Sequence, residues 1–406
     1  MKTRGNSIII GATAFIMLTY ITLSVVGARE NTEIEIEKIN GKISQLGNVK
    51  VVAIAPYSDF KARKLIFNSN GNNEIEEIKY DRFYNVDEKV LNNKDLYRET
   101  MYPTTSFENS DVQIIGSGDW NEIDIAENLN SYTINIACKE KNSGKIERIK
   151  TDKKVYDMSL LKIQVVGNKT YLIAEEVEMS NDKMEPKLVV YNVDFKNKAI
   201  DEVKRYDVLE NTRCIPSNNS VKNNKFYFLI NHNADDYLGK KSAYKISIGC
   251  INLNTLELDT VDYDLFEVND MELDSSVQYY IEGNKLYGIS TVATNYNKIK
   301  SDYFFQFDLE KNKFDIVKEL GINVNTTKKE EDIIDFKVEK NKMCLLLRKK
   351  YKEDDGNPIR QSECFVKVIN MDTQKEVMMA KILPNSEYYY SIKLDKDLSK
   401  TKEKGA

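Results

Sequence analysis

A short phrase recurs along the chain and constrains its fold more than any other feature. The phrase is a strand-like run, a turn containing Asn and a second strand-like run, and "YYIEGNKLYGIS" at residues 279–290 is its clearest copy. Its turn asparagines lie 56, 60 and 57 residues apart, at Asn168, Asn224, Asn284 and Asn341. A second hairpin follows each copy, so one period holds four short antiparallel strands. A fixed period of this size with four strands per unit is typical of β-propeller blades.

The period also predicts the number of units. Residues 47–394 hold about six repeats, so we expect an all-β fold, a β-propeller of about six four-stranded blades, with seven as the alternative. The two upstream units are less regular, and their expected strands are 49–57, 63–69 and 74–83 for the first and 112–118, 121–126, 132–140 and 144–152 for the second. "LNNKDLY" at 91–97 echoes the turn phrase and raises the seven-blade alternative. A spare strand, residues 386–394, is expected to pair with the N-terminal blade and seal its edge.

These units resemble β-propeller proteins of the broad kind with "gnkLYv…viDl…gk" repeats, over residues 160–383 clearly and 47–159 weakly. The Lys- and Asn-rich, Pro-poor composition resembles that of low-GC bacteria, so the likeness is to envelope propellers with an N-terminal membrane anchor. The WD and kelch signatures and the sialidase Asp box are absent from the sequence, and Trp120 does not supply the last. Such a resemblance implies an architecture and carries no activity.

The N-terminus predicts a membrane anchor. Residues 7–28 are uncharged and follow Lys2 and Arg4. In a helix they reach about 33 Å, enough to cross a hydrocarbon core of about 30 Å. We expect an uncleaved signal-anchor in the cell membrane, single-pass, with the N-terminus cytoplasmic and the body outside. Cleavage after Ala28, which would give a secreted protein, stays open.

The expected organisation is therefore a linear series of parts. Residues 29–46 form a stalk, either a short helix or an outer edge strand, and residues 396–406 a charged tail. The order is a cytoplasmic tip 1–6, a transmembrane helix 7–28, the stalk 29–46, the propeller 47–395 and the tail 396–406.

Composition and motifs narrow the chemistry. A net charge of −5 gives no support for a nucleic-acid partner. His232 is the only histidine, so a histidine zinc cluster is excluded and we expect no metal and no cofactor. The five cysteines are scattered; Cys250, Cys344 and Cys364 lie in apolar strand runs and are expected to be buried small hydrophobes, with one disulfide left open. Gly116 and Gly118 are expected to mark a strand end or bulge. The carboxylate pairs Glu175-Glu176 and Glu330-Glu331 are expected on a solvated face.

A binding face is predicted from position. The longest insertions, 178–185, 231–242, 293–301 and 348–362, fall between the second and third strands of each unit. They should emerge together with the links between units, 207–219, 266–276 and 321–332, opposite the tight turns. Functional groups tend to sit on variable loops held by a rigid scaffold. The candidate ligand-binding residues on this face are His232, Asp235, Asp236, Tyr237, Tyr296, Tyr351, Asp354 and Asp355; no catalytic residue is proposed.

Two functions follow from different classes. The first is a membrane-tethered extracytoplasmic binding or scaffolding module for an envelope protein or cell-wall polymer, with no enzymatic activity expected. The alternative is a carboxylate-dependent envelope glycan hydrolase or lyase that uses the propeller funnel, since glycosidases need only Asp and Glu.

Overall fold

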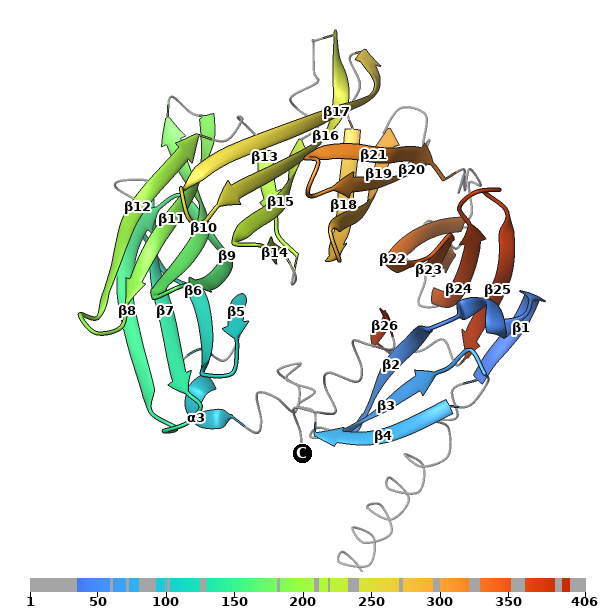
Figure 1. Cartoon of the computed structure of the whole chain (residues 1–406), viewed down its shortest axis with the longest axis horizontal. Helices are drawn as coiled ribbons and strands as arrows, with labels where there is room; N and C mark the ends of the chain where they lie inside the picture. The colour runs from blue at the N-terminus through green and yellow to red at the C-terminus, as the bar shows by residue number, and fades with distance from the viewer. Residues whose placement is uncertain are drawn as a thin grey trace, which may run out of the picture. The chain divides into compact units, whose positions relative to one another are not determined.

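The computed structural model describes residues 35–394, apart from 59–60, 71–72, 80–92, 99, 101–102, 125–128, 181–182, 208–211, 218–219, 233–240, 270–272, 295–299, 321–328, 352–361 and 384–388. The described part is nearly all β (Figure 1). It divides into two compact units. Unit 1 comprises Met1–Leu91 with Thr326–Ala406, and unit 2 comprises Asn92–Asn325. No helix among the described residues is long and apolar enough to cross a membrane, and residues 7–28 lie outside them.

Unit 2 holds four antiparallel sheets, each of strands consecutive in the chain. Sheet 2 contains β5 (Thr105–Glu108), β6 (Val112–Asp124), β7 (Leu129–Glu140) and β8 (Ile146–Val155). Sheet 3 contains β9 (Asp157–Val166), β10 (Lys169–Ser180), β11 (Lys183–Asp194) and β12 (Ala199–Asp207). Sheet 4 contains β13 (Thr212–Ile215), β14 (Val221–Lys222), β15 (Lys225–His232), β16 (Lys241–Asn252) and β17 (Glu257–Asn269). Sheet 5 contains β18 (Leu273–Glu282), β19 (Lys285–Thr294), β20 (Lys300–Asp308) and β21 (Lys313–Glu319).

Unit 1 holds two sheets, and in each a strand from a chain terminus is added to strands distant in sequence. Sheet 1 contains β2 (Val49–Ser58), β3 (Lys61–Phe67) and β4 (Asn73–Lys79), preceded in sheet order by β26 (Tyr389–Leu394). Sheet 6 contains β22 (Lys329–Glu339), β23 (Lys342–Tyr351), β24 (Ser362–Asn370) and β25 (Glu376–Leu383), with β1 (Glu35–Gly41) outside β25. The pairing of β26 with β2, from Val49↔Leu394 to Ile54↔Tyr389, is the one predicted for the spare C-terminal strand.

The four-strand units and their hairpins are confirmed. Of the two structures expected for the stalk, a short helix or an outer edge strand, residues Glu35–Gly41 form the edge strand. Residues 112–118 and 121–126 are not two strands, because β6 runs through both with one bulge at Asn121, between Trp120 and Glu122. The first strand of sheet 2 is instead β5. Residues 91–97 give no seventh sheet: the described part of this segment ends in a one-turn helix, α3 (Lys94–Tyr97), whose Leu96 and Tyr97 are buried.

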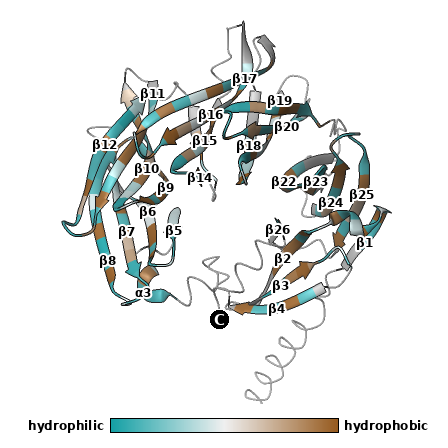
Figure 2. Ribbon diagram, viewed as in Figure 1, coloured by the Kyte–Doolittle hydropathy of each residue, from teal (hydrophilic) through white to brown (hydrophobic). Residues whose placement is uncertain are grey.

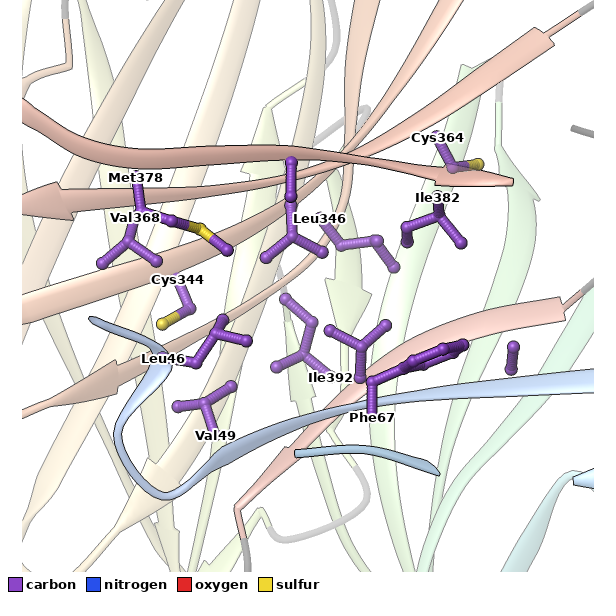
Figure 3. Close-up of a cluster of buried hydrophobic side chains, with 14 of the residues drawn as sticks. Leu46, Val49, Phe67, Cys344, Leu346, Cys364, Val368, Met378, Ile382 and Ile392 are labelled. Atoms are coloured by element: carbon purple, nitrogen blue, oxygen red, sulfur yellow. The ribbon is translucent and has the colours of Figure 1, made fainter. Parts of the chain in front are cut away.

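The cores lie between successive sheets of a unit. The core of unit 1 joins sheets 1 and 6 and includes side chains from both terminal regions, such as Leu46, which belongs to the short 3₁₀ helix η1 (Ile43–Leu46), and Ile392 (Figure 3). Three further clusters fill the spaces between sheets 2 and 3, 3 and 4, and 4 and 5. The fourth strands β8 and β12 carry mainly hydrophilic residues (Figure 2). Alternation along the strands therefore buries apolar faces between sheets, as expected for stacked antiparallel sheets.

Glycines allow close packing at two cross-strand pairs. Gly249 lies opposite Phe228, and Gly288 lies opposite Phe305. A Cβ at Gly249 would lie 2.2 Å from the Phe228 ring, and one at Gly288 would lie 2.0 Å from the Phe305 ring. Gly116 allows similarly close packing between sheets, because a Cβ at this position would lie 2.7 Å from the Ile163 side chain. It lies inside β6 and does not mark the bulge.

Candidate functional site

Every sheet has two unlike ends. We call "turn end" the end that carries the hairpin between the third and fourth strands and, in sheets 2 to 6, also the hairpin between the first and second strands; in sheet 1 the first strand, β26, is not joined to β2 by a hairpin. We call "loop end" the end that carries the connection between the second and third strands. The same end receives the links between consecutive sheets, as the strand directions require.

The turn end is held by a repeated set of backbone hydrogen bonds. The N–H of Leu253 donates to the Asn224 carbonyl (2.8 Å), Leu309 to Asn284 (2.9 Å) and Met371 to Asn341 (2.7 Å). Each bond joins the second hairpin of a sheet to the turn asparagine of the first. The recurring Asn is therefore part of a structural clasp, and its repetition follows from the repeated sheet.

The second hairpins share a turn as well. Their loops start at Asp194, Asn252, Asp308 and Asn370, and in each the side-chain oxygen accepts an N–H two or three residues later. Four residues after each lies a residue with positive φ: Lys198, Leu256, Asn312 and Gln374. This is the arrangement of a type I turn followed by a left-handed residue, a common hairpin loop. The hydrogen bond from the Lys311 N–H is the main cause that lowers the pKa of Asp308.

Two of the eight predicted ligand-binding residues are at the loop ends of described strands. His232 is the last residue of β15 and Tyr351 the last of β23, so the backbone positions of both are at loop ends. Asp235, Asp236, Tyr237, Tyr296, Asp354 and Asp355 lie outside the described residues. That these eight residues share a binding face stays a prediction.

One predicted insertion is wrong. Residues 178–185 do not form a long connection, because β10 and β11 continue pairing to Ser180↔Lys183. The run of mainly apolar residues in β10 ends at Val177. The mainly polar residues that follow resemble a loop in the sequence. Connections between described second and third strands thus range from residues 181–182 in sheet 3 to residues 352–361 in sheet 6.

A buried carboxylate pair lies in the loop-end half of sheet 3. Glu175 and Glu176 of β10 are 2% and 0% exposed, so the expectation of a solvated face is wrong for this pair. For Glu330 and Glu331 the structure gives only the strand, β22, and the backbone register with Lys350 and Lys349. Burying a carboxylate is costly unless it is paired or hydrogen-bonded. The two adjacent side chains obtain their partners in different ways.

Glu176 is the centre of a charged network. Its carboxylate lies 2.9 Å from Nη2 of Arg205 and 3.3 Å from Nζ of Lys153, and it accepts a hydrogen bond from the Tyr191 hydroxyl. Arg205 also pairs with Glu178 at 2.8 Å and Glu202 at 2.7 Å. Lys153 belongs to β8 of sheet 2, so the network joins two sheets. We call these residues the Glu176 network.

The network has consistent electrostatics. Burial, followed by the bond to Glu176, raises the pKa of Tyr191 well above its ordinary value. The hydrogen bond from Arg205 lowers the pKa of Glu202. Tyr191 therefore stays a neutral donor and Glu202 stays ionised at neutral pH, which suits a structural tie and not proton transfer.

Glu175 has a different partner. Its Oε2 accepts a hydrogen bond of 2.6 Å from the backbone N–H of Cys214 in β13. The bond ties sheet 3 to sheet 4. Similar ties occur elsewhere: the Tyr279 hydroxyl donates to the Tyr227 carbonyl (3.0 Å) between sheets 5 and 4, and the Ile163 N–H donates to Thr105 Oγ1 (2.9 Å) between sheets 3 and 2.

The cysteines offer no activated nucleophile. All five are free and buried. Burial raises the pKa of Cys138 and Cys250 to about 11 and that of Cys344 to about 12, and it also raises the pKa of Cys364. A reactive thiol needs the opposite shift. The part of the chain that the structure describes holds no group of His, Cys, Asp and Glu that could bind a metal ion.

An exposed aromatic residue lies near the loop end of sheet 2, and the sequence interpretation gave it no role. Trp120, at the bulge of β6, is 56% exposed and lies opposite Tyr132 in the strand register. The Tyr132 hydroxyl donates to Asp157 Oδ1 at 3.0 Å, joining sheet 2 to sheet 3. Exposed tryptophan is uncommon on a soluble domain and frequent at binding surfaces. Trp120 is the only tryptophan in the sequence, and this could have identified it as a candidate binding residue.

Comparisons with known proteins supply no family. No protein-family model and no curated protein matches the chain. Similar solved structures include the polysaccharide lyase Uly1 (TM-score 0.43, 6% identity, covering 69% of this chain and 72% of that one). They also include the WD40 domain of SCAP from fission yeast (TM-score 0.36, 8% identity, covering 84% and 77%) and a Trypanosoma rangeli sialidase in complex with sialic acid (TM-score 0.30, 9% identity, covering 92% and 60%). With TM-scores below 0.5 and identities of 6–9%, these likenesses decide nothing about function.

Proposed function

We propose that the six sheets are the blades of a β-propeller that acts as a binding or scaffolding module, held outside the cell membrane by residues 7–28. The ligand is an envelope protein or a cell-wall polymer, bound by the loop ends. The observation that carries the proposal is the contrast between the two ends of the sheets. The turn ends of sheets 4, 5 and 6 repeat one hydrogen-bonded clasp, whereas the loop-end connections differ from sheet to sheet.

The scaffold beneath the loop ends supports this role. The buried carboxylates Glu175 and Glu176 are engaged in ties between sheets, and four of the five buried thiols have raised pKa values. Rigid sheets that carry variable connections are the usual setting for recognition. Trp120 adds an exposed anchor at the loop-end half of sheet 2.

A loop replacement tests the proposal. The chain itself contains a short version of the connection, since β10 and β11 are joined by residues 181–182 alone. Replacing residues 351–361 by Asn-Gly, a strong two-residue turn, should leave folding intact and weaken capture of the native envelope partner at least tenfold. Capture is measured by crosslinking in native envelopes, followed by quantitative recovery.

The matched control changes the other end. Exchanging the β24–β25 turn residues 371–374 for the β20–β21 turn residues 309–312 keeps the turn geometry and should leave capture unchanged. Equal capture by the loop-replaced and parent chains would contradict the proposal. Turnover of an envelope glycan, with no partner recovered, would favour the alternative of a carboxylate-dependent hydrolase or lyase.

A further inference from the structure

The N-terminal strand fixes which end of unit 1 lies near residues 7–28. β25 leaves the β24–β25 turn at the turn end and runs to the loop end, where it finishes at Leu383. β1 is antiparallel to it, with Glu35↔Leu383 at one extreme and Gly41↔Met378 at the other. The chain therefore enters sheet 6 at the loop end and travels towards the turn end. This direction follows from register alone.

The strand is firmly seated, so the entry point is fixed. Gly41 has φ +72°, and a Cβ there would lie 2.1 Å from the Val377 carbonyl oxygen, which shows how closely β1 approaches β25. Asn40 donates to the Glu376 carboxylate at 3.4 Å. Immediately after β1, Leu46 and Val49 are 1% and 0% exposed in the core of unit 1. This core holds the chain in place immediately after β1.

The connection to the anchor is short compared with the sheet. Residues 29–34 separate the uncharged segment from β1, and six residues reach at most about 20 Å when fully extended. The nine residues of β24 span about 30 Å between the turn end and the loop end. A tether of this length keeps the loop end of sheet 6 close to a bilayer that contains residues 7–28, whereas the turn end can lie up to about 30 Å further away.

We infer that the loop end of unit 1 faces the membrane surface, within about 20 Å of the lipid headgroups. This inference rests on the proposed anchor and extends it. The turn end, with its β3–β4 and β24–β25 hairpins, faces away from the bilayer. A partner captured by this loop end is therefore expected at the membrane surface.

Distances from the membrane test the inference on the full chain in proteoliposomes. Glu77 lies on β4 near the loop end of sheet 1, and Asn70 lies in the β3–β4 turn; both are exposed. Lys375, exposed at the turn end of sheet 6, provides a second turn-end site. Each is changed singly to Cys and labelled with a donor dye, while the five buried native thiols stay unlabelled in the folded chain. The acceptor is attached to lipid headgroups.

Energy transfer should be clearly stronger from E77C than from N70C and K375C, by an amount that corresponds to at least about 13 Å, the rise of the four residues from Asn73 to Glu77. Equal transfer from the three sites, or stronger transfer from N70C and K375C, would overturn the orientation. Inserting 20 Gly/Ser residues after Arg29 should abolish the difference; its persistence would also overturn the inference, since the short connection would not be its cause. A chain that fractionates away from lipid would overturn the anchor itself, a separate result.

Discussion

Adjacent glutamates in β10 show how a single strand serves two interfaces. Because neighbouring side chains of a strand point to opposite faces, Glu175 reaches sheet 4 and Glu176 reaches sheet 2. Each is buried, and each is balanced by a partner from another strand. The pair is therefore a connection across three sheets in unit 2, and its cost of burial is offset only while the partners remain.

The Glu176 network gives a first prediction. Changing Arg205 to Met should destabilise the protein by about 2–3 kcal/mol, because Lys153 still partly compensates Glu176, whereas a buried charge left with no partner costs about 3–5 kcal/mol. The control is E178Q, which removes the 46%-exposed partner of the same guanidinium and should cost less than about 1 kcal/mol. Urea unfolding measures the loss of unfolding free energy in both variants. Equal losses would contradict the claim that the burial of Glu176 causes the larger effect of R205M.

The left-handed turn residues give a second prediction. Lys198 and Gln374 are exposed and have φ of +53° and +56°, where glycine has no steric penalty. Each Gly substitution should stabilise the protein by about 0.5–1 kcal/mol, the left-handed strain less the added chain entropy. The control K196G lies in the same turn at an ordinary φ and should be neutral or destabilising. Denaturant midpoints decide the sign.

The Asx turns give a pH-dependent prediction. The pKa of Asp308 is lowered in the folded state, mainly by the hydrogen bond from the Lys311 N–H. Its stabilising effect is therefore complete above the unfolded pKa of about 3.9 and is lost as the pH falls through the lower folded value. Asn occupies the same position in two sister turns, at Asn252 and Asn370. D308N should thus match the parent at pH 7 and lose less stability between pH 4 and 2, as measured by thermal unfolding.

At the scale of the element, sequence and structure agree on hairpins and disagree on burial. The Gly-Asn, Asn-Asn and Lys-Asn turns and the period of nearly 60 residues predicted sheets 3 to 6, because tight-turn chemistry is local. Burial of Glu175 and Glu176 depends on partners in β13, β12 and β8, which no local pattern reports. In sheet 2, Gly116 and Gly118 suggested a break in β6, but they make room for side chains of sheet 3. The predicted ligand-binding loops depend on residues outside the described ranges.

The cross-strand glycine–phenylalanine pairs give a prediction for elements. G288A should destabilise sheet 5 by about 1–3 kcal/mol, because the new methyl group overlaps the Phe305 ring. The same G288A change made in the F305L background, where the ring is absent, should cost less stability than it does in the parent chain. A double-mutant cycle on unfolding free energies measures the coupling, and additive losses would mean that the two side chains do not interfere.

At the scale of the whole molecule, both terminal regions complete sheets in unit 1. β1 extends sheet 6, and β26 extends sheet 1. Asp335 of β22 strengthens the second connection, since its Oδ2 accepts the Ile392 N–H of β26 at 2.8 Å. Glu339 of the same strand accepts the Asn48 N–H at 2.9 Å, at the start of β2. Sheets 1 and 6 are thereby linked by carboxylates as well as by their common apolar core.

The two units can be followed separately through their thiols. Cys344 and Cys364 are buried in unit 1, and Cys138, Cys214 and Cys250 are buried in unit 2. Removing residues 384–406 deletes β26 and the buried Ile392, so unit 1 thiols should become alkylated at lower urea than in the parent. Unit 2 thiols should react at nearly unchanged urea. Pulsed alkylation with mass spectrometry gives both transitions, and an unchanged unit 1 transition would show that β26 is dispensable.

The β2–β26 pairing also sets the order of events during synthesis. Val49 pairs with Leu394, so a strand made at the beginning of the chain waits for one made almost at the end. Until then β2 has an unpaired edge, and unpaired edges invite association with other chains. Ribosomes add about 5–20 residues per second, so this interval lasts on the order of 20 seconds or more. A chain secreted as it is made would therefore need protection, by a chaperone or by rapid export, until its last strand arrives.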